Sequence, residues 1–245
     1  MPRFFLSPDK FSENTVLIDG ENARHIAKAL RMKVGDTVTL CDGENNEYFC
    51  RLDAFTDTQV YASVIEKSAC KSEPPYRVTL LQCLPKSDKM EYIIQKSVEL
   101  GVNRIIPVES SRCVVRLDDK SAPKKIERWQ KIANEAAGQC GRGIMPAVEM
   151  PASFSRALEL LGESGLGMFC YENERIRTIS EVLKSCENPP KEIYVLIGSE
   201  GGFSPEEARL AEEKGFIVTG LGPRILRTET APLCVLSIIS AFLEL

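Results

Sequence analysis

Two short glycine-rich segments near the C-terminus have the composition of ligand-binding loops. Residues 198–202 read GSEGG after the apolar run 193–197, and residues 220–223 read GLGP after the apolar run 216–219. Glycine adopts backbone angles that other residues avoid, and it lets a ligand approach the main chain closely. Neither segment has the lysine of a phosphate-binding P-loop or the spacing of a dinucleotide fingerprint. The segments therefore favour a ligand site built largely from backbone groups, although paired glycine turns also occur in ordinary α/β connections.

A third segment carries side chains that could take part in chemistry. Residues 225–231 read ILRTETA and supply a guanidinium (Arg227), a carboxylate (Glu229) and two hydroxyls (Thr228 and Thr230). They lie directly before a strongly apolar C-terminal stretch, where a simple connector needs none of these groups. The segment therefore indicates a functional loop.

The surrounding elements predict that these segments meet at one edge of a sheet. The run 193–197 lacks polar alternation, as in a strand buried on both faces. A helix begins after it with Ser204 as N-cap, Pro205 in the first turn and Glu207 in capping-box spacing, and 216–219 predicts the next strand. Two parallel strands joined by one helix place both glycine loops at the carboxyl edge, where open α/β sheets bind ligands.

Composition excludes several other kinds of site. The chain has one histidine, His25, and nine cysteines without a Cys-x-x-Cys pair, so we expect neither a metal site nor a histidine-activated nucleophile. Unpaired cysteines and the lack of an apolar run near the roughly 20 residues of a membrane helix predict a cytoplasmic protein. The net charge of −4 argues against broad nonspecific binding of nucleic acid. What remains is a transfer reaction in which a cofactor supplies the reactivity and the protein supplies the orientation.

The first 70 residues contain short alternating runs typical of a small β-rich unit. Within it, residues 21–33 have helical spacing, and Arg24, Lys28 and Arg31 would share one face of that helix. Such a face is either solvated or positions phosphates of a nucleic acid. Residues 68–75 (SACKSEPP) are polar and end in two prolines, so they predict a linker.

Beyond the linker, strand and helix patterns alternate to the C-terminus. Residues 86–100 predict a helix in which Asp88 and Glu91 have capping-box spacing. The last segment, 231–245, is apolar around most of its circumference, which predicts a helix buried on nearly every side. In a chain of this size, a subunit interface is a natural explanation for such burial.

Several motifs together resemble those of one family. The segments IGSEGGFS (197–204) and LGPRILRTETA (221–231) resemble signatures of the 16S ribosomal RNA (uracil-N3)-methyltransferase family, which belongs to the SPOUT class. KSDKMEYIIQKSVELGV (86–102), EAAGQCGR (135–142) and the N-terminal RFFL and HIAKALRMKVGD extend the resemblance over nearly the whole chain. One position departs, because Ser199 stands where the family usually has proline; the loop is then less rigid but keeps its glycines and Glu200.

The resemblance implies an α/β fold: a SPOUT-type knotted α/β methyltransferase domain preceded by a small PUA-like β-barrel domain. The barrel would span residues 1–70 and hold RNA, and residues 75–245 would form the methyltransferase domain with a C-terminal trefoil knot. The knot follows from the resemblance alone, since unknotted connections are the general rule. A homodimer is implied as well. The RNA-binding residues would be Arg3, Arg24, His25, Lys28, Arg31, Lys33 and Lys86.

The resemblance also implies S-adenosylmethionine as cofactor, no metal, and 16S ribosomal RNA or the small ribosomal subunit as substrate. The cofactor-binding residues would be Leu196, Ile197, Gly198, Glu200, Gly201, Gly202, Leu221, Gly222, Leu226, Arg227, Thr228, Glu229, Thr230 and Ala231. Uracil N3 loses a proton before it accepts a methyl group, so catalysis needs a base or cations that stabilise the anion. Arg142, facing the active site of a neighbouring subunit, and Arg227 are the candidate cations. Glu200 and Glu229 are the candidate proton acceptors, and the sequence does not choose between them.

Two alternatives stay open, and a third lacks its signature in the sequence. A SPOUT methyltransferase for another RNA atom, such as a ribose 2′-hydroxyl, would share the pocket but carry a different polar set. A catalytically silent RNA-binding factor in ribosome assembly would have damaged cofactor loops. A nucleotide-binding oxidoreductase would need an acidic ribose anchor after a proper fingerprint, and the sequence has none.

Overall fold

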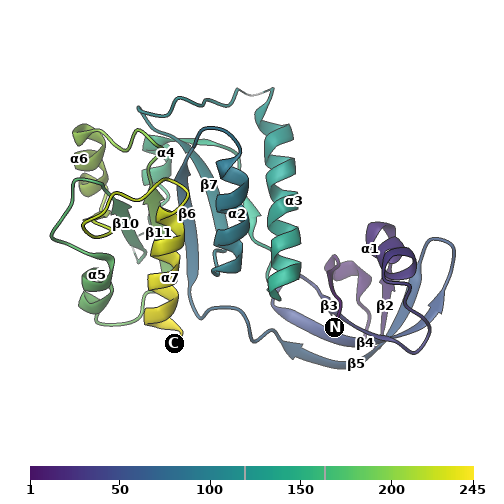
Figure 1. Ribbon diagram of the computed structural model, residues 1–245. Helices are drawn as coiled ribbons and strands as arrows, with labels where there is room; N and C mark the ends of the chain where they lie inside the picture. Colours follow the sequence, from purple (N-terminus) through teal and green to yellow (C-terminus); the bar gives the residue numbers. More distant parts are fainter. Residues whose placement is uncertain (119, 163) are drawn as a thin grey trace. The chain divides into compact units, whose positions relative to one another are not determined.

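The computed structural model describes residues 1–118, 120–162 and 164–245 (Figure 1). The chain forms two compact units. Residues 1–73 with 137–145 make the first unit, and residues 74–136 with 146–245 make the second. The sequence predicts 75–245 as one domain, whereas the structure groups residues 137–145 with the N-terminal unit.

The first unit is built on a five-stranded mixed sheet with the order β1-β3-β4-β5-β2. Strand β1 runs parallel to β3, the other neighbours are antiparallel, and shifts of register interrupt the β4–β5 pair. Alternate side chains of the strands, such as those of Val38, Leu40 and Leu52, form one hydrophobic core. The elements are β1 (Arg3–Phe5), η1 (Pro8–Lys10), β2 (Thr15–Ile18), β3 (Thr37–Cys41), β4 (Asn46–Phe55) and β5 (Val60–Ala69).

The helix predicted over 21–33 is shorter in the structure. An α-helical turn, α1 (Gly20–Arg24), passes into a π-helical turn, η2 (His25–Ala29). Arg31 then adopts a φ of +53°, which ends the helix because a left-handed residue cannot continue it. The prediction that Arg31 extends the helical face of Arg24 and Lys28 was therefore wrong.

The second unit contains a parallel sheet with the order β12-β10-β11-β6-β7-β8, and β9 also pairs with β7. The strand predicted over 193–197 is confirmed as β11, which is buried except for half-buried Glu192 and Tyr194. Its neighbours β10 and β6 run parallel to it, so the carboxyl ends of all three strands lie at one edge. The strands are β6 (Arg77–Cys83), β7 (Arg104–Glu109), β8 (Ala147–Val148), β9 (Ala152–Ser153), β10 (Leu166–Cys170), β11 (Glu192–Ile197) and β12 (Ile217–Thr219).

The described residues of this unit form, wholly or largely, the helices α2 (Lys89–Glu99), α3 (Ala122–Cys140), α4 (Phe154–Leu158), α5 (Ile179–Ser185), α6 (Pro205–Glu213) and α7 (Ala231–Leu243). The capping box of Ser204 and Glu207 on α6 is confirmed in both directions. The one predicted for Asp88 and Glu91 is wrong, because Asp88 lacks the extended backbone of a capping residue and its side chain makes no cap hydrogen bond. None of the described helices is long and apolar enough to cross a bilayer.

Helix α7 is only partly covered within one chain. Its inner stripe packs toward α2, α5 and β11 (Figure 1). The buried members of that stripe are Ala231, Pro232, Val235, Leu236 and Ile239. Phe242 is 41% exposed, and Leu233 and Ile238 are half-buried. One chain therefore leaves part of α7 uncovered, and burial of that part at a subunit interface stays a prediction.

Candidate active site

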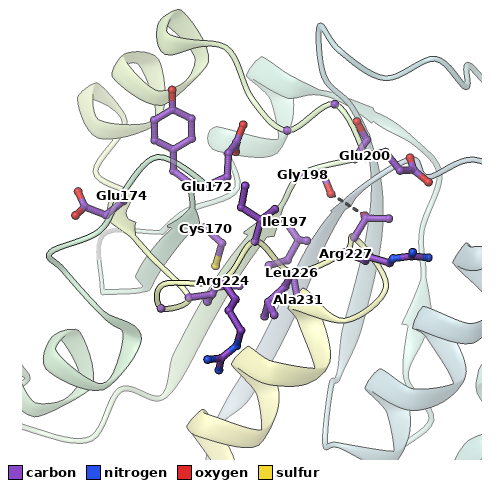
Figure 2. Close-up of a pocket in the computed structure, with 18 of the residues that line it drawn as sticks. Cys170, Glu172, Glu174, Ile197, Gly198, Glu200, Arg224, Leu226, Arg227 and Ala231 are labelled. Atoms are coloured by element: carbon purple, nitrogen blue, oxygen red, sulfur yellow. Dashed lines mark hydrogen bonds between the residues drawn. The ribbon is translucent and has the colours of Figure 1, made fainter.

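A cavity of about 510 Å³ lies at the carboxyl edge of the parallel sheet, within the size range of small-molecule sites (Figure 2). It is lined from the ends of β10 and β11 and from the loop between β12 and α7. The predicted cofactor residues that line it are Ile197, Gly198, Glu200, Gly201, Gly202, Leu221, Gly222, Leu226, Arg227, Thr228 and Ala231. Leu196 lies in the core with no exposed surface, and Glu229 and Thr230 lie beside the lining residues in the chain. The two glycine loops thus meet as the βαβ pattern predicts.

The glycines of these loops are required by their surroundings. Gly202 has a φ of +62°, and a Cβ there would overlap the carboxylate of Glu172. A Cβ on Gly220 would overlap the carbonyl oxygen of Glu174. Gly222 has a φ of +95° with no protein atom within 4 Å of the Cβ position, so the cavity is open beside its backbone. The loops therefore expose main chain to a ligand, as the sequence predicts.

The buried hydroxyl of Thr228 links the loop before α7 to the loop after β11 by a hydrogen bond. Thr228 Oγ1 donates to the Gly198 carbonyl oxygen over 2.7 Å and accepts from Gln82 Nε2 over 3.1 Å. Thr228 is 5% exposed, and Gln82 is fully buried at the end of β6. This contact fixes the start of α7 against the end of β11.

Lys89, which the sequence prediction missed, connects the same two loops by ion pairs. Its Nζ lies 2.9 Å from Glu200 Oε1 and 3.2 Å from Glu229 Oε2, and Lys89 lines the cavity. Burial raises the pKa of the Glu200 carboxyl, but hydrogen bonds from Lys89 and from the Lys86 backbone outweigh it and lower the pKa below its ordinary value. A signal was present in the sequence, because a lysine at a helix start faces the positive end of the helix dipole and needs compensating carboxylates.

Arg142 does not line the cavity of its own chain. It is 2% exposed in the first unit, and its Nε and Nη2 each donate to the Glu73 carboxylate over 2.8 Å. The same carboxylate accepts the backbone N–H groups of Gly143 and Ile144. Burial opposes ionisation of Glu73, yet these donors lower its pKa. The role of Arg142 at the site of a second subunit stays a prediction.

The predicted RNA-binding residues fall into two groups. Arg24, His25, Lys28, Arg31, Lys33 and Lys86 are exposed. Arg3 is different: it donates to the Arg142 carbonyl oxygen over 3.1 Å and pairs with Glu47. It therefore stabilises the first unit, whatever else it contacts. No group of His, Cys, Asp or Glu that could hold a metal ion occurs among the residues that the structure describes.

Comparison with known proteins matches both parts of the chain. A model of the RNA methyltransferase domain family matches residues 72–240, and a model of the RNA methyltransferase PUA domain family matches residues 18–65. The ribosomal RNA small subunit methyltransferase E of Bacillus subtilis is 39% identical over 100% of this chain and 98% of its own length. That of Synechocystis is 32% identical over 99% of this chain and 78% of its own.

A solved structure agrees with these matches. The ribosomal RNA small subunit methyltransferase E of Neisseria gonorrhoeae, solved bound to S-adenosyl methionine, superposes with a TM-score of 0.87. It is 34% identical and covers 98% of this chain and 97% of its own. The fold and the glycine-lined cavity thus define an RNA methyltransferase of the SPOUT type with an N-terminal PUA-like domain. Within that class, the chain belongs to the ribosomal RNA small subunit methyltransferase E family.

Proposed function

We propose that this protein transfers a methyl group from S-adenosylmethionine to N3 of a specific uridine in 16S ribosomal RNA, near the decoding centre of the small subunit. The observation that carries the proposal is the cavity between two intact glycine loops in a chain of this family. Intact loops argue against a silent assembly factor. The protein would act in the cytoplasm, where ribosomal subunits are assembled.

The residues of the cavity fit this cofactor. Ile197, Leu226 and Ala231 offer apolar surface for the adenine ring, and the open main chain at Gly222 offers backbone N–H and C=O groups. The cavity volume is that of a site for a ligand of this size. When bound, the cofactor supplies an electrophilic methyl group on its sulfonium sulfur. The protein's contribution is to orient that group and to exclude water.

Uracil N3 carries a proton, so side chains of the site must help to remove it or stabilise the anion that remains. Arg227 is exposed and lines the cavity, so its guanidinium can stabilise the uridine anion as N3 loses its proton. Arg142 of a second subunit is the other proposed cation. Glu200 is a weak base because its pKa is lowered, and Lys89 holds it as an ion pair. Glu229 pairs with the same lysine, so anion stabilisation by arginine is favoured over proton transfer to either carboxylate, and the N3 proton would leave to solvent before the methyl group is transferred.

The first unit would bind the RNA, and the second unit would bind the cofactor and the target base. The first unit would hold RNA through the exposed cations of α1 and η2 and the loop after them, which contact phosphates without reading sequence. N3 lies on the pairing edge of uracil, so the target base must be unpaired or flipped out to enter the cavity. The apolar side chains that α7 leaves uncovered support a homodimer.

Methyl transfer to purified small ribosomal subunits tests the proposal. The subunits come from cells that lack this gene, the cofactor carries a labelled methyl group, and the digested RNA is analysed by nucleoside mass spectrometry. Labelled 3-methyluridine is the expected product. Label on a ribose or another base would show that the enzyme methylates an atom other than uracil N3. No label despite cofactor binding would favour an assembly factor.

A further inference from the structure

Lys89 lies where three separate segments of the chain meet. It is the first residue of α2, Glu200 follows β11, and Glu229 lies two residues before the first residue of α7. The ammonium group is within 3.2 Å of a carboxylate oxygen from each of the two glutamates. Glu200 also accepts the Lys86 backbone N–H, so the segment before α2 is fixed to the first glycine loop twice.

The charges of this group depend on one another. The side chains of Lys89, Glu200 and Glu229 are 30%, 28% and 21% exposed, so all three are partly shielded from water. The carboxylates raise the pKa of Lys89, Glu200 most. Without the lysine, two carboxylates from different loops would face each other with no cation between them. Like charges at such a distance repel, and the loops that carry them would separate.

We propose that Lys89 is a positioning residue: it keeps the loop after β11 and the loop before α7 in register, and with them the two walls of the cofactor cavity. Thr228 links the same loops by an uncharged hydrogen bond to the Gly198 carbonyl oxygen. Lys89 makes the ionic tie at the cavity wall itself, where Glu200 is seen in Figure 2. The inference rests on the proposed function only for the identity of the ligand. It assigns to Glu200 and Glu229 a structural role as anchors of this lysine.

The test compares Lys89→Met, Lys89→Arg and a matched control, Lys96→Met. Lys96 lies on the same helix, pairs with Glu99 over 2.8 Å and is exposed to a similar degree. Isothermal titration with S-adenosylmethionine gives Kd, and amide hydrogen exchange gives the opening of 199–202 and 225–230. Because two partly exposed ion pairs are lost, Lys89→Met should raise Kd roughly three- to tenfold. It should also speed exchange in both loops, while Lys89→Arg and Lys96→Met stay near the wild type.

A double variant distinguishes repulsion between the Glu200 and Glu229 carboxylates from the simple loss of the Lys89 ion pairs. Glu229→Gln removes one of the two facing carboxylates, so Lys89→Met with Glu229→Gln should bind the cofactor more tightly than Lys89→Met alone. High salt should weaken cofactor binding in the wild type and have less effect in Lys89→Met, because salt screens the ion pairs. Circular dichroism and thermal unfolding confirm that each variant is folded.

Unchanged exchange and an unchanged Kd in folded Lys89→Met would overturn the inference. A rise in KM for RNA with an unchanged Kd for the cofactor would also overturn it, since Lys89 would then contact the substrate. If the folded wild type binds no S-adenosylmethionine, the proposed function fails. Hydrogen exchange in the two loops would still decide the role of Lys89 in that case.

Discussion

Replacement of Glu73 by glutamine tests the buried ion pair that fixes Arg142. The Glu73 carboxylate accepts four donors: Nε and Nη2 of Arg142 and the backbone N–H groups of Gly143 and Ile144. Both side chains are nearly inaccessible, at 3% and 5% exposure. Glutamine keeps the shape and one acceptor oxygen but turns the other oxygen into an NH₂ group that opposes a guanidinium donor.

The expected cost is large because the cation stays buried after its partner is neutralised. Removal of one member of a buried ion pair costs about 3–5 kcal/mol, and glutamine should lie at the lower end because part of the hydrogen bonding survives. For a chain of this length, about 3 kcal/mol lowers Tm by roughly 6–12 °C if unfolding is cooperative. Arg142→Ala would carry a similar penalty, so its loss of activity alone says nothing about catalysis.

Differential scanning calorimetry with Asp53→Asn as control provides the assay. Asp53 pairs with Arg51 in the same unit, but both side chains are well exposed, so its loss should shift Tm by less than about 2 °C. If Glu73→Gln lowers Tm no more than Asp53→Asn does, the buried ion pair does not stabilise the first unit. Residual methylation measured below the Tm of Glu73→Gln should approach that of the wild type if Arg142 remains in place.

Three further predictions concern the cavity. Gly220→Ala should weaken cofactor binding tenfold or more in calorimetry, because the added Cβ overlaps the backbone of the facing loop. Gly162→Ala, which places its Cβ in open space, should leave the affinity unchanged. Equal affinities of the two variants would contradict this prediction. Thr228→Val should lower stability by about 1–3 kcal/mol in urea unfolding because Gly198 and Gln82 lose their partner, and Thr228→Ser should restore it. A lowered pKa of Glu200 in the folded state means that its contribution is complete above the ordinary value of 4.5 and is lost as pH falls through the folded value. Below the ordinary value, Tm should therefore fall less steeply in Glu200→Gln than in the wild type, and an equal fall in that variant would contradict the assignment.

The sequence allowed the cavity to be predicted because its determinants are local. Strand burial, the Ser204 cap and the glycines at 198–202 and 220–222 each follow from nearby residues, and a parallel βαβ unit brings the two loops together whatever surrounds them. The family and its cofactor followed from motifs at the same positions. The trefoil knot stays a prediction.

The side-chain partners could not be predicted in the same way. Lys89 lies more than 100 residues before its two glutamates, and Glu73 lies 69 residues before Arg142, so no local spacing reveals either group. Helix periodicity also failed at Arg31, because the pattern of apolar residues does not record a π-helical turn or a left-handed residue. These contacts depend on how distant segments pack, which single-sequence patterns do not carry.

The 3-methyluridine content of 16S ribosomal RNA from cells with and without this gene tests directly whether uracil N3 is the methylated atom. Deletion should remove one 3-methyluridine per small subunit. The intact gene should restore it, and the Gly220→Ala variant should restore it only in part. An unchanged 3-methyluridine content after deletion, or the loss of a different modified nucleoside, would contradict the assignment of uracil N3 as the methylated atom.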